Sequence, residues 1–321
     1  MIQEILLAFW LIAAVCIVLT RRTYRIPIYF GVFSLITAVV YLTFGAPDVA
    51  MAEAGISAFV TIFMIVCIEK YYSLTSSLAQ EQSRYKSASN RILRATIPLL
   101  FTAGLFGLFI YFIPTSPVST YLKEQYLLLF MTDVGGENAV TAIYLGYRVY
   151  DTLFEALLLV TAVVAVSHMS WYGKDEIAQG RRSDVENSGM TKFTMRIICP
   201  IILLFGAYLI LNGHISAGGG FLGGLTIATF FICRFLVLDI YDLPIKKVLM
   251  IEELVFIYIT VIPILAIFTG ALYLAPEVSP FFRNAYLIIM NALIGMKVAC
   301  GFFVLFYRYI AIERLSLGNG R

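Results

Sequence analysis

Apolar runs of about 17–25 residues, the length that a helix needs to cross the hydrocarbon core of a bilayer, recur along the whole sequence. Sixty per cent of the 321 residues are hydrophobic and 13 % are charged, so the length predicts a bundle of spans instead of two soluble domains. The runs cover residues 3–20, 26–44, 48–68, 95–113, 151–169, 194–212, 221–239, 250–272 and 285–308. They predict an all-α integral membrane protein with about nine transmembrane helices.

The distribution of lysine and arginine predicts the orientation of these spans. With the N-terminus outside, 19 of the 23 basic residues fall in inside segments or at the span ends that border them. Only Lys123, Arg148 and Arg283 fall outside, and Lys297 falls within a span. The positive-inside rule therefore predicts an outside N-terminus and an inside C-terminus. Because the basic residues are spread over separate short loops, the sequence gives no indication of nucleic-acid binding.

Two long polar segments, 70–94 and 172–192, are predicted to be inside linkers that divide the spans into blocks of three, two and four. The predicted division is a three-span module over 1–72, a linker over 73–94, a two-span module over 95–171, a linker over 172–192 and a four-span module over 193–321. Residues 138–150 fit either an amphipathic helix on the outer surface or an extension of the fifth span.

The cysteines and the first run exclude two further interpretations. All five cysteines lie within apolar runs and no two form a C-x-x-C pair, which argues against an iron–sulfur cluster, a zinc site or a disulfide framework. We therefore expect no metal and no other cofactor in this chain. Residues 1–20 have no basic n-region and no small-residue cleavage site, so they are predicted to be a retained span and not a signal peptide.

A glycine-rich stretch interrupts the apolar sequence between the sixth and seventh runs. Its glycines are Gly213, Gly218, Gly219, Gly220, Gly223 and Gly224. Irregular backbone at membrane depth is tolerated only where it is buried in protein or lines a wet cavity, so the stretch predicts a hinge or an ion-facing helix break. A tight turn with closely packed helices is the other interpretation. His214 adds a titratable ring here, and it fits a structural cap as well as a relay.

The third run opens with two acidic residues. Asp48 follows Pro47 at the predicted start of a helix, where the positive end of the helix dipole favours a carboxylate, so a capping role is expected as well as a place on an ion path. Glu53 lies about 7–8 Å deeper along the helix, among alanine and glycine residues that let another helix approach. A charge at that depth needs a partner or water, which favours a role in relaying protons or cations.

The fifth run begins with Arg148, Asp151 and Glu155 on one helix face. Arg148 is expected to hold Asp151 ionised. Glu155 lies one turn further in, where burial and its acidic neighbour favour the protonated form and make exchange of a proton near neutral pH possible. A structural carboxylate paired with a donor from another span is the other interpretation.

Lys297 stands about twelve residues from either end of the ninth run, too far for its side chain to reach an interface comfortably. It must meet a carboxylate, a carbonyl group or water, and either a static ion pair or a role in ion transfer fits the sequence. Glu155 and Glu53 are the expected partners. Most of the acidic residues near the inner interface, and His168, are expected to be solvated; the acidic ones are Glu69, Asp239, Glu252 and Glu253.

Three of these segments resemble modules of Mrp-type multisubunit sodium/proton antiporters. Residues 45–55 read GAPDVAMAEAG and resemble the MbhD module; residues 138–143 and 151–155 read NAVTAI and DTLFE and resemble the MbhE module. Residues 213–224 read GHISAGGGFLGG and resemble the signature of the MrpB (MbhF) subunit, with Ala217 where that family usually has proline. The three matches occur in family order and span nearly the whole chain.

The resemblance implies a fused MbhD–MbhE–MbhF subunit that transports Na+ or H+ in the cytoplasmic membrane of a bacterium or archaeon, with no redox centre and no enzymatic activity of its own. It implies other Mrp/Mbh-type membrane subunits, an antiporter-like subunit, and hydrogenase and iron–sulfur subunits as partners. A membrane-bound hydrogenase-type respiratory complex is favoured, because the long antiporter-like domain that precedes the first two modules in Mrp antiporters does not precede them here. Carried over by position, the ion-path residues are Asp48, Glu53, Asp151, Glu155 and Lys297, with His214 and the glycines shaping the path.

Three interpretations of the function stay open. In the first, carboxylates and Lys297 pass ions across the membrane within a larger complex. In the second, the chain is a structural scaffold that docks an antiporter-like subunit while its buried charges merely pair. In the third, it belongs to a stand-alone Mrp antiporter or transports alone; the absence of a visible inverted repeat disfavours transport by this chain alone.

Overall fold

The computed structural model describes residues 2–20, 25–75, 104, 107, 120–169, 189–238, 245–268 and 280–318. All regular secondary structure within these ranges is helical. Apart from residues 104 and 107, the predicted fourth span, 95–113, lies outside the described residues, as do most of the predicted linkers at 73–94 and 172–192.

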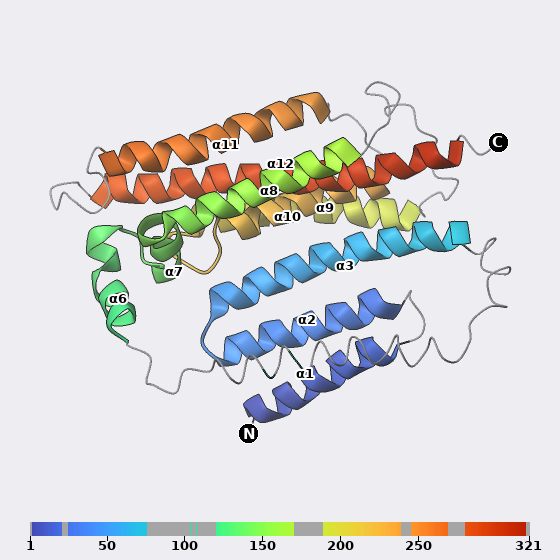
Figure 1. Cartoon of the computed structure of the whole chain (residues 1–321), viewed down its shortest axis with the longest axis horizontal. Coiled ribbons are helices and arrows are strands. Elements are labelled where there is room, and N and C mark those ends of the chain that lie inside the picture. Colours follow the sequence, from blue (N-terminus) through green and yellow to red (C-terminus); the bar gives the residue numbers. More distant parts are fainter. Residues whose placement is uncertain are drawn as a thin grey trace.

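The N-terminal helices form a group at one side of the bundle (Figure 1). They are α1 (Ile2–Leu19), α2 (Ile26–Thr43) and α3 (Pro47–Thr75). Pro27 lies in the first turn of α2, where a missing N–H group costs nothing. Gly45, with a φ of 72°, turns the chain after α2, so that α3 begins at Pro47 and packs back against α2.

The middle of the chain contains a succession of short helices followed by one long helix. They are α6 (Tyr121–Asp133), α7 (Ala139–Ala142), the π-helix η2 (Ile143–Tyr147) and α8 (Val149–Met169). In Figure 1, α6 lies across the end of the bundle, close to α7. Thr141, Ala142 and Leu145 are fully buried, so one face of residues 139–147 packs inside the protein, whereas Val140 is 43 % exposed.

The C-terminal helices are α9 (Gly189–Asn212), α10 (Gly220–Val237), α11 (Ile245–Phe268) and α12 (Pro280–Gly318). α10 packs against both α9 and α12 and also reaches α3. α12 in turn contacts α8, α9 and α11. α10 and α12 therefore connect the N-terminal, middle and C-terminal groups of helices.

The membrane prediction is confirmed in its general form. Among the described residues, six helices are long and apolar enough to cross a membrane, and Gln3–Leu19 and Gly220–Phe235 are apolar but shorter. The six spans are Ile26–Thr43, Pro47–Ile65, Val149–His168, Gly189–Asn212, Ile245–Phe268 and Phe281–Arg308. The count of nine spans, their grouping and their orientation stay predictions.

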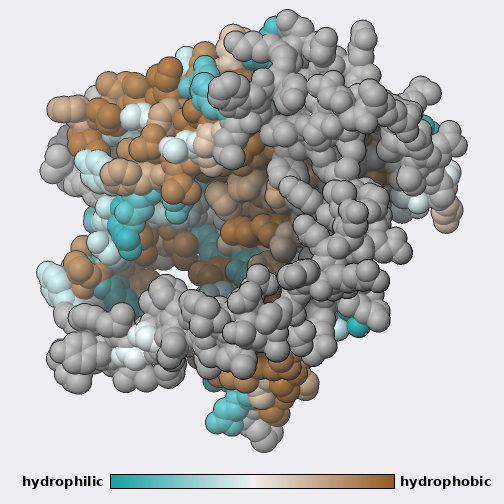
Figure 2. Space-filling view, turned by 45° about the vertical axis from the view of Figure 1, so that its right-hand side comes forward, coloured by the Kyte–Doolittle hydropathy of each residue, from teal (hydrophilic) through white to brown (hydrophobic). Residues whose placement is uncertain are grey.

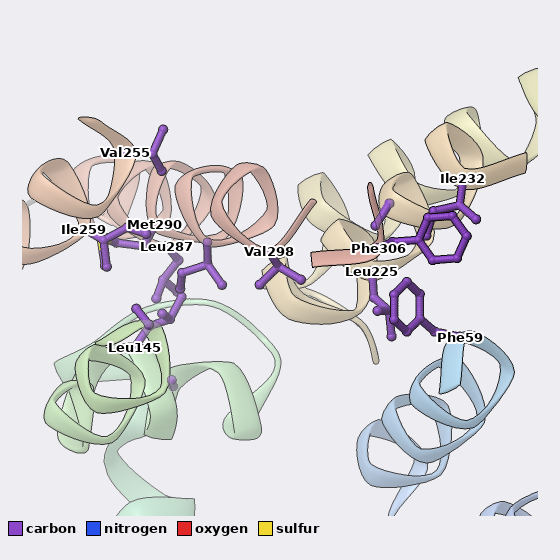
Figure 3. Close-up of a cluster of buried hydrophobic side chains, with 14 of the residues drawn as sticks. Phe59, Leu145, Leu225, Ile232, Val255, Ile259, Leu287, Met290, Val298 and Phe306 are labelled. Carbon is purple, nitrogen blue, oxygen red and sulfur yellow. The ribbon is translucent and has the colours of Figure 1, made fainter. Parts of the chain in front are cut away.

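Apolar side chains form the core of this fold and also cover much of its exterior. Figure 3 shows the interior cluster, in which Phe59 of α3, Leu145 of η2 and Leu225 of α10 lie around residues of α11 and α12. On the exterior, Leu204 is 71 % exposed and Phe268 is 84 % exposed. Hydrophobic residues likewise dominate the described part of the face in Figure 2. An apolar exterior around an apolar core is expected for helices surrounded by lipid.

Candidate functional site

The glycine-rich stretch forms the break between α9 and α10. α9 ends at Asn212 and α10 begins at Gly220. Gly219 has a φ of 110°, a conformation that a residue with a side chain rarely adopts. A Cβ atom at Gly220 would collide with the backbone carbonyl oxygen of Asn291, so this glycine lets α10 approach α12 closely. The structure thus contains both a helix break and close helix packing, while a role of the break as a hinge or an ion-facing segment stays a prediction.

His214 lies within this break, and its contacts are structural. Its backbone carbonyl oxygen accepts hydrogen bonds from the amides of Glu137 at 2.8 Å and Asn138 at 3.1 Å. Its Nδ1 atom lies 3.0 Å from the carbonyl oxygen of Leu211, at the end of α9. The ring therefore caps its own helix, while the backbone fixes the segment before α7 to the break.

Asn138 connects the break to two other parts of the chain. Its Oδ1 atom accepts hydrogen bonds from the amides of Val140 and Thr141 and so caps the N-terminus of α7. Its Nδ2 atom donates to Asp48 Oδ1 at 3.0 Å and to the carbonyl oxygen of Ser216 at 2.9 Å. This residue was not among the predicted site residues, although an asparagine before Ala-Val-Thr-Ala is a recognisable helix-capping signal.

Asp48 is half-buried and binds the break directly. Besides the amide of Asn138, its Oδ1 atom accepts a hydrogen bond from the backbone N–H of Gly218 at 3.3 Å. Asp48 was expected to cap its own helix or to lie on an ion path. In the structure, it joins the start of α3 to the break between α9 and α10.

A second polar contact lies on the other side of the break. Tyr144 donates a hydrogen bond from its hydroxyl to Asn291 Oδ1 at 2.9 Å, and the amide of Gly220 donates to the same atom at 3.0 Å. Burial raises the pKa of Tyr144 from 10.0 to about 12, so the hydroxyl stays a donor at physiological pH. Asn291 is fully buried, and its Nδ2 atom has no hydrogen-bond partner among the described residues.

Glu53 pairs within the N-terminal group of helices. The buried hydroxyl of Ser34 in α2 donates a hydrogen bond to Glu53 Oε1. Glu53 therefore lies at the interface of α2 and α3, and it is not the partner of Lys297. Its chain neighbours, Ala52 and Ala54, are small, as the expected close approach of another helix requires.

Lys297 forms an ion pair with Glu252 of α11. The two residues are 1 % and 2 % exposed, and Lys297 Nζ lies 5.4 Å from the centre of the Phe256 ring. The burial of Lys297 and its need for a partner were predicted correctly. The prediction that Glu155 or Glu53 is its partner was wrong.

Glu252 is an exception to the expectation that most of the acidic residues near the inner interface are solvated. Glu252 lies seven residues, about 10 Å, along α11 from Ile245, on the face that packs against α12. Its neighbour Glu253 is exposed, as is His168, whereas the side chains of Glu69 and Asp239 lie outside the described residues. Hydropathy alone does not say which face of α11 meets another helix.

The acidic residues of α8 lie on an exposed face, and Glu155 is near enough to Tyr144 for its charge to contribute to the raised pKa of that hydroxyl. Arg148 Nη2 lies 2.5 Å from Asp151 Oδ2, which confirms the expected pair, and the side chains are 61 % and 50 % exposed. Glu155 is also exposed on the described bundle. The structure therefore separates the predicted site residues into four groups: Asp48 and His214 at the break, Glu53 with Ser34, Lys297 with Glu252, and the face of α8.

Two known families match separate regions of the chain. Residues 190–313 match the family described as a domain related to the MnhB subunit of Na+/H+ antiporters, and residues 8–72 match the MbhD family, described as the D subunit of MBH. The chain resembles subunits of Mrp/Mbh-type antiporter modules. The MnhB-related match contains the break and the Glu252–Lys297 pair, and the MbhD match contains Asp48 and Glu53.

Individual Mrp-type relatives extend this likeness. The putative antiporter subunit mnhB2 of Staphylococcus epidermidis is 37 % identical over 84 residues, which are 24 % of this chain and 60 % of the relative. The probable A/B subunit of a K+/H+ antiporter of Rhizobium meliloti is 23 % identical over 231 residues, which are 64 % of this chain and 23 % of the relative. The chain thus spans less than two thirds of the length of these relatives.

Two solved structures are also similar. A chain of the membrane-bound sulfane sulfur reductase, an archaeal respiratory membrane complex, aligns with a TM-score of 0.57 and 27 % identity over 68 % of this chain and 97 % of that chain. A chain of the Mrp complex from Dietzia sp. DQ12-45-1b aligns with a TM-score of 0.64 over 93 % of this chain and 34 % of that chain. At 18 % identity, the second likeness shows the fold alone.

Proposed function

We propose that the chain is a non-redox membrane subunit of a multisubunit complex and forms part of its Na+/H+ translocation path. The two family matches and the antiporter relatives support a transport component that is not an enzyme by itself. The buried Glu252–Lys297 pair in the MnhB-related region is the structural observation that carries the proposal.

In finer detail, we propose a fused MbhD–MbhE–MbhF subunit with the five-part division given above. The likeness to a sulfane sulfur reductase chain over 97 % of that chain supports a respiratory parent complex related to membrane-bound hydrogenases, in the cytoplasmic membrane of a bacterium or archaeon. Its partners are then other Mrp/Mbh-type membrane subunits, an antiporter-like subunit, and hydrogenase-type and iron–sulfur subunits. Membership of a stand-alone Mrp antiporter is the alternative.

The energetics of the Glu252–Lys297 pair support a role in ion transfer. Desolvating two charges costs several kcal/mol per ion, and an apolar pair of similar size is often equally stable or more stable, so ion pairs of this kind are weak devices for stability. Ionisable residues within membrane helices instead mark ion and proton pathways. Glu252 and Lys297 are both almost completely enclosed within the described bundle.

The pair provides a simple mechanism. When a proton or a metal cation neutralises the Glu252 carboxylate, Lys297 is left with an uncompensated positive charge in a medium of low dielectric constant. That charge repels a second cation until the first has left and the pair has re-formed. The two residues thus limit occupancy to one positive charge at a time, which is a requirement for ordered exchange of Na+ and H+.

The test compares the double variant Glu252→Gln/Lys297→Met with the control Glu253→Gln. Neutralising both members avoids an unpaired buried charge, so the complex should assemble. The control makes the same substitution at the adjacent residue, Glu253, whose side chain is exposed. In inside-out membrane vesicles, we expect the double variant to lose Na+ uptake and the coupled pH change while the control keeps both. Wild-type transport in an assembled double variant would contradict the proposal.

A second candidate function is a scaffold, which the hydrogen bonds around Asn138 favour because they join three separate parts of the chain. The same variants distinguish it. A scaffold should retain transport in the double variant, whereas replacing Asn138 should reduce the amount of assembled complex in the membrane.

A further inference from the structure

Oxygen atoms from several segments gather around the amide nitrogen of Asn138. Asp48 Oδ1 lies at 3.0 Å, and the carbonyl oxygens of Ser216 and Gly213 lie at 2.9 and 3.4 Å. Thr141 Oγ1 lies 2.6 Å from the same carbonyl oxygen of Gly213 and adds a fourth oxygen. We call these four atoms the oxygen cage. Asn138 is 8 % exposed and Thr141 is fully buried, whereas Asp48 and Ser216 are half-buried, so the cage is enclosed on the side of Asn138 and Thr141 and lies nearer to solvent on the other.

The charge of the oxygen cage favours a cation. Asp48 contributes a carboxylate, and within the described residues it forms hydrogen bonds to amides but no ion pair with lysine or arginine. The carbonyl group of Gly213 directly follows the C-terminal end of α9, where the helix dipole is negative, and Ser216, four residues beyond Asn212, donates its backbone N–H to the carbonyl oxygen of Asn212. An unwound segment that offers carbonyl oxygens beside a helix end is also the way in which broken helices of transporters coordinate Na+.

The geometry points to a binding site for a dehydrated monovalent cation, Na+ or K+, in the oxygen cage, with the amide nitrogen of Asn138 holding the place of the ion in this structure. This inference rests on the proposed function, because it names a cation-binding station on the proposed path. One carboxylate balances the charge of one such ion. The neutral ligands are carbonyl and hydroxyl oxygens, which suit hard cations.

The surrounding contacts allow the exchange of amide for ion. Thr141 Oγ1 also lies 3.4 Å from the hydroxyl oxygen of Tyr144. The Thr141 hydroxyl can therefore donate its hydrogen to Tyr144 and direct a lone pair of Oγ1 toward the ion. Tyr144 still donates to Asn291. Withdrawal of the Asn138 side chain releases the cap of α7, which precedes α8 through η2. Occupancy of the cage therefore changes the segment that leads into α8.

The experiment measures cation binding by the intact complex, isolated through an affinity tag on this chain. Thermal unfolding is followed in NaCl, KCl and choline chloride at equal ionic strength. The wild type should melt at a higher temperature in at least one alkali salt than in choline. Asp48→Asn keeps an oxygen acceptor but removes the charge, so it should raise the half-saturating cation concentration by about tenfold or more.

Asn138→Asp is the most informative variant. It replaces the amide nitrogen with oxygen beside Asp48, so the two carboxylates repel in choline and an alkali cation should relieve the repulsion, giving a larger cation-dependent shift than the wild type. The control is Asn284→Asp. Asn284 Oδ1 accepts a hydrogen bond from the amide of Gly136 at 2.9 Å, outside the cage, so the substitution keeps that bond, adds the same charge and should leave the shift unchanged.

Several outcomes would overturn the inference. One is a wild type with no cation-specific shift, and another is an equal loss of stability by Asn138→Asp in all three salts, which would make Asn138 a structural connection only. If Asn138→Asp does not assemble, Asp48→Asn and the isosteric Thr141→Val decide, and both must weaken cation binding. The binding experiment applies no ion gradient, so the two proposals can fail separately. Absence of cation binding in the cage, together with normal transport by the wild type, would overturn the inference and leave the proposed function intact. Normal cation binding, together with normal transport by Glu252→Gln/Lys297→Met, would overturn the proposed function and leave the inference intact.

Discussion

The helix break and the interface of α11 with α12 both bury polar atoms, and they satisfy these atoms in different ways. At the break, the Asp48 carboxylate of α3 shares several hydrogen bonds with neutral side-chain and backbone groups, and Thr141 of α7 and Asn291 of α12 form others. At the α11–α12 interface, two full charges depend on each other, beside the apolar residues Val255 and Ile259. A network distributes the loss of one partner over several bonds, whereas an isolated ion pair has no substitute for a missing charge.

The difference also separates two tasks. Hydrogen bonds of the break hold parts of the chain that are far apart in sequence, such as Asp48 and Gly218, in one arrangement. The ion pair lies within the MnhB-related region alone and joins two successive helices. The break is therefore suited to connect the matched regions, and the ion pair is suited to respond to the charge of a passing ion.

The largest expected effect comes from removing one member of the ion pair. Lys297→Met should destabilise the complex by about 3–5 kcal/mol, because the Glu252 carboxylate is left buried without a partner. Adding Glu252→Gln should restore most of that loss. The measurement is the unfolding of the purified complex in detergent. A single variant as stable as the double variant would mean that water or another group already compensates Glu252, and the contrast with the break would disappear.

A smaller effect is expected at the break from Gly220→Ala. The new Cβ atom would collide with the carbonyl oxygen of Asn291 and approach Ile294 Cβ to 2.9 Å. Overpacking of this kind costs about 1–3 kcal/mol. Gly189→Ala is the control, since no atom lies within 4 Å of a Cβ atom there. Equal melting temperatures of the two variants would show that α10 and α12 separate easily.

The two regions were predictable from sequence to different degrees. Hydropathy predicted the long apolar helices that the structure describes, and glycine spacing predicted the break, because both signals are local. The burial of Lys297 was also predicted, since its distance from the ends of the run is a local property. Its partner Glu252 was not, because the choice depends on which face of α11 packs against α12. Asn291 was not predicted as a site residue for the same reason, because its partners Tyr144 and Gly220 belong to other helices.

Tyr144→Phe tests how far the network compensates for a lost bond. It removes the hydroxyl donor to Asn291 Oδ1, but the amide of Gly220 still donates to that atom, so a loss of about 0.5–1.5 kcal/mol is expected at neutral pH. The pKa of Tyr144 is raised from 10.0 to about 12 by burial. Its contribution is therefore complete below pH 10 and is lost as the pH rises towards 12.

The melting temperatures of the wild type and Tyr144→Phe should accordingly converge as the pH is raised from about 8 to about 11. Alkaline pH affects other groups of the complex in both proteins, so the difference between them is the quantity to measure. A difference that stays constant over this range would show that the Tyr144 hydroxyl is accessible to solvent, contrary to its enclosed position beside Asn291.

The smallest effect is expected for Arg148→Ala, which breaks the exposed pair with Asp151. Side chains that are 61 % and 50 % exposed are screened by solvent, and pairs of this kind contribute about 0–1 kcal/mol. The isolated complex should therefore melt almost as the wild type does, and added salt should reduce the difference further. A loss as large as that of Lys297→Met would show that another subunit covers this face of α8 in the complex. In that case Arg148, Asp151 and Glu155 would form a second enclosed charged site, and the contrast between a hydrogen-bonded break and a single buried ion pair would have to include it.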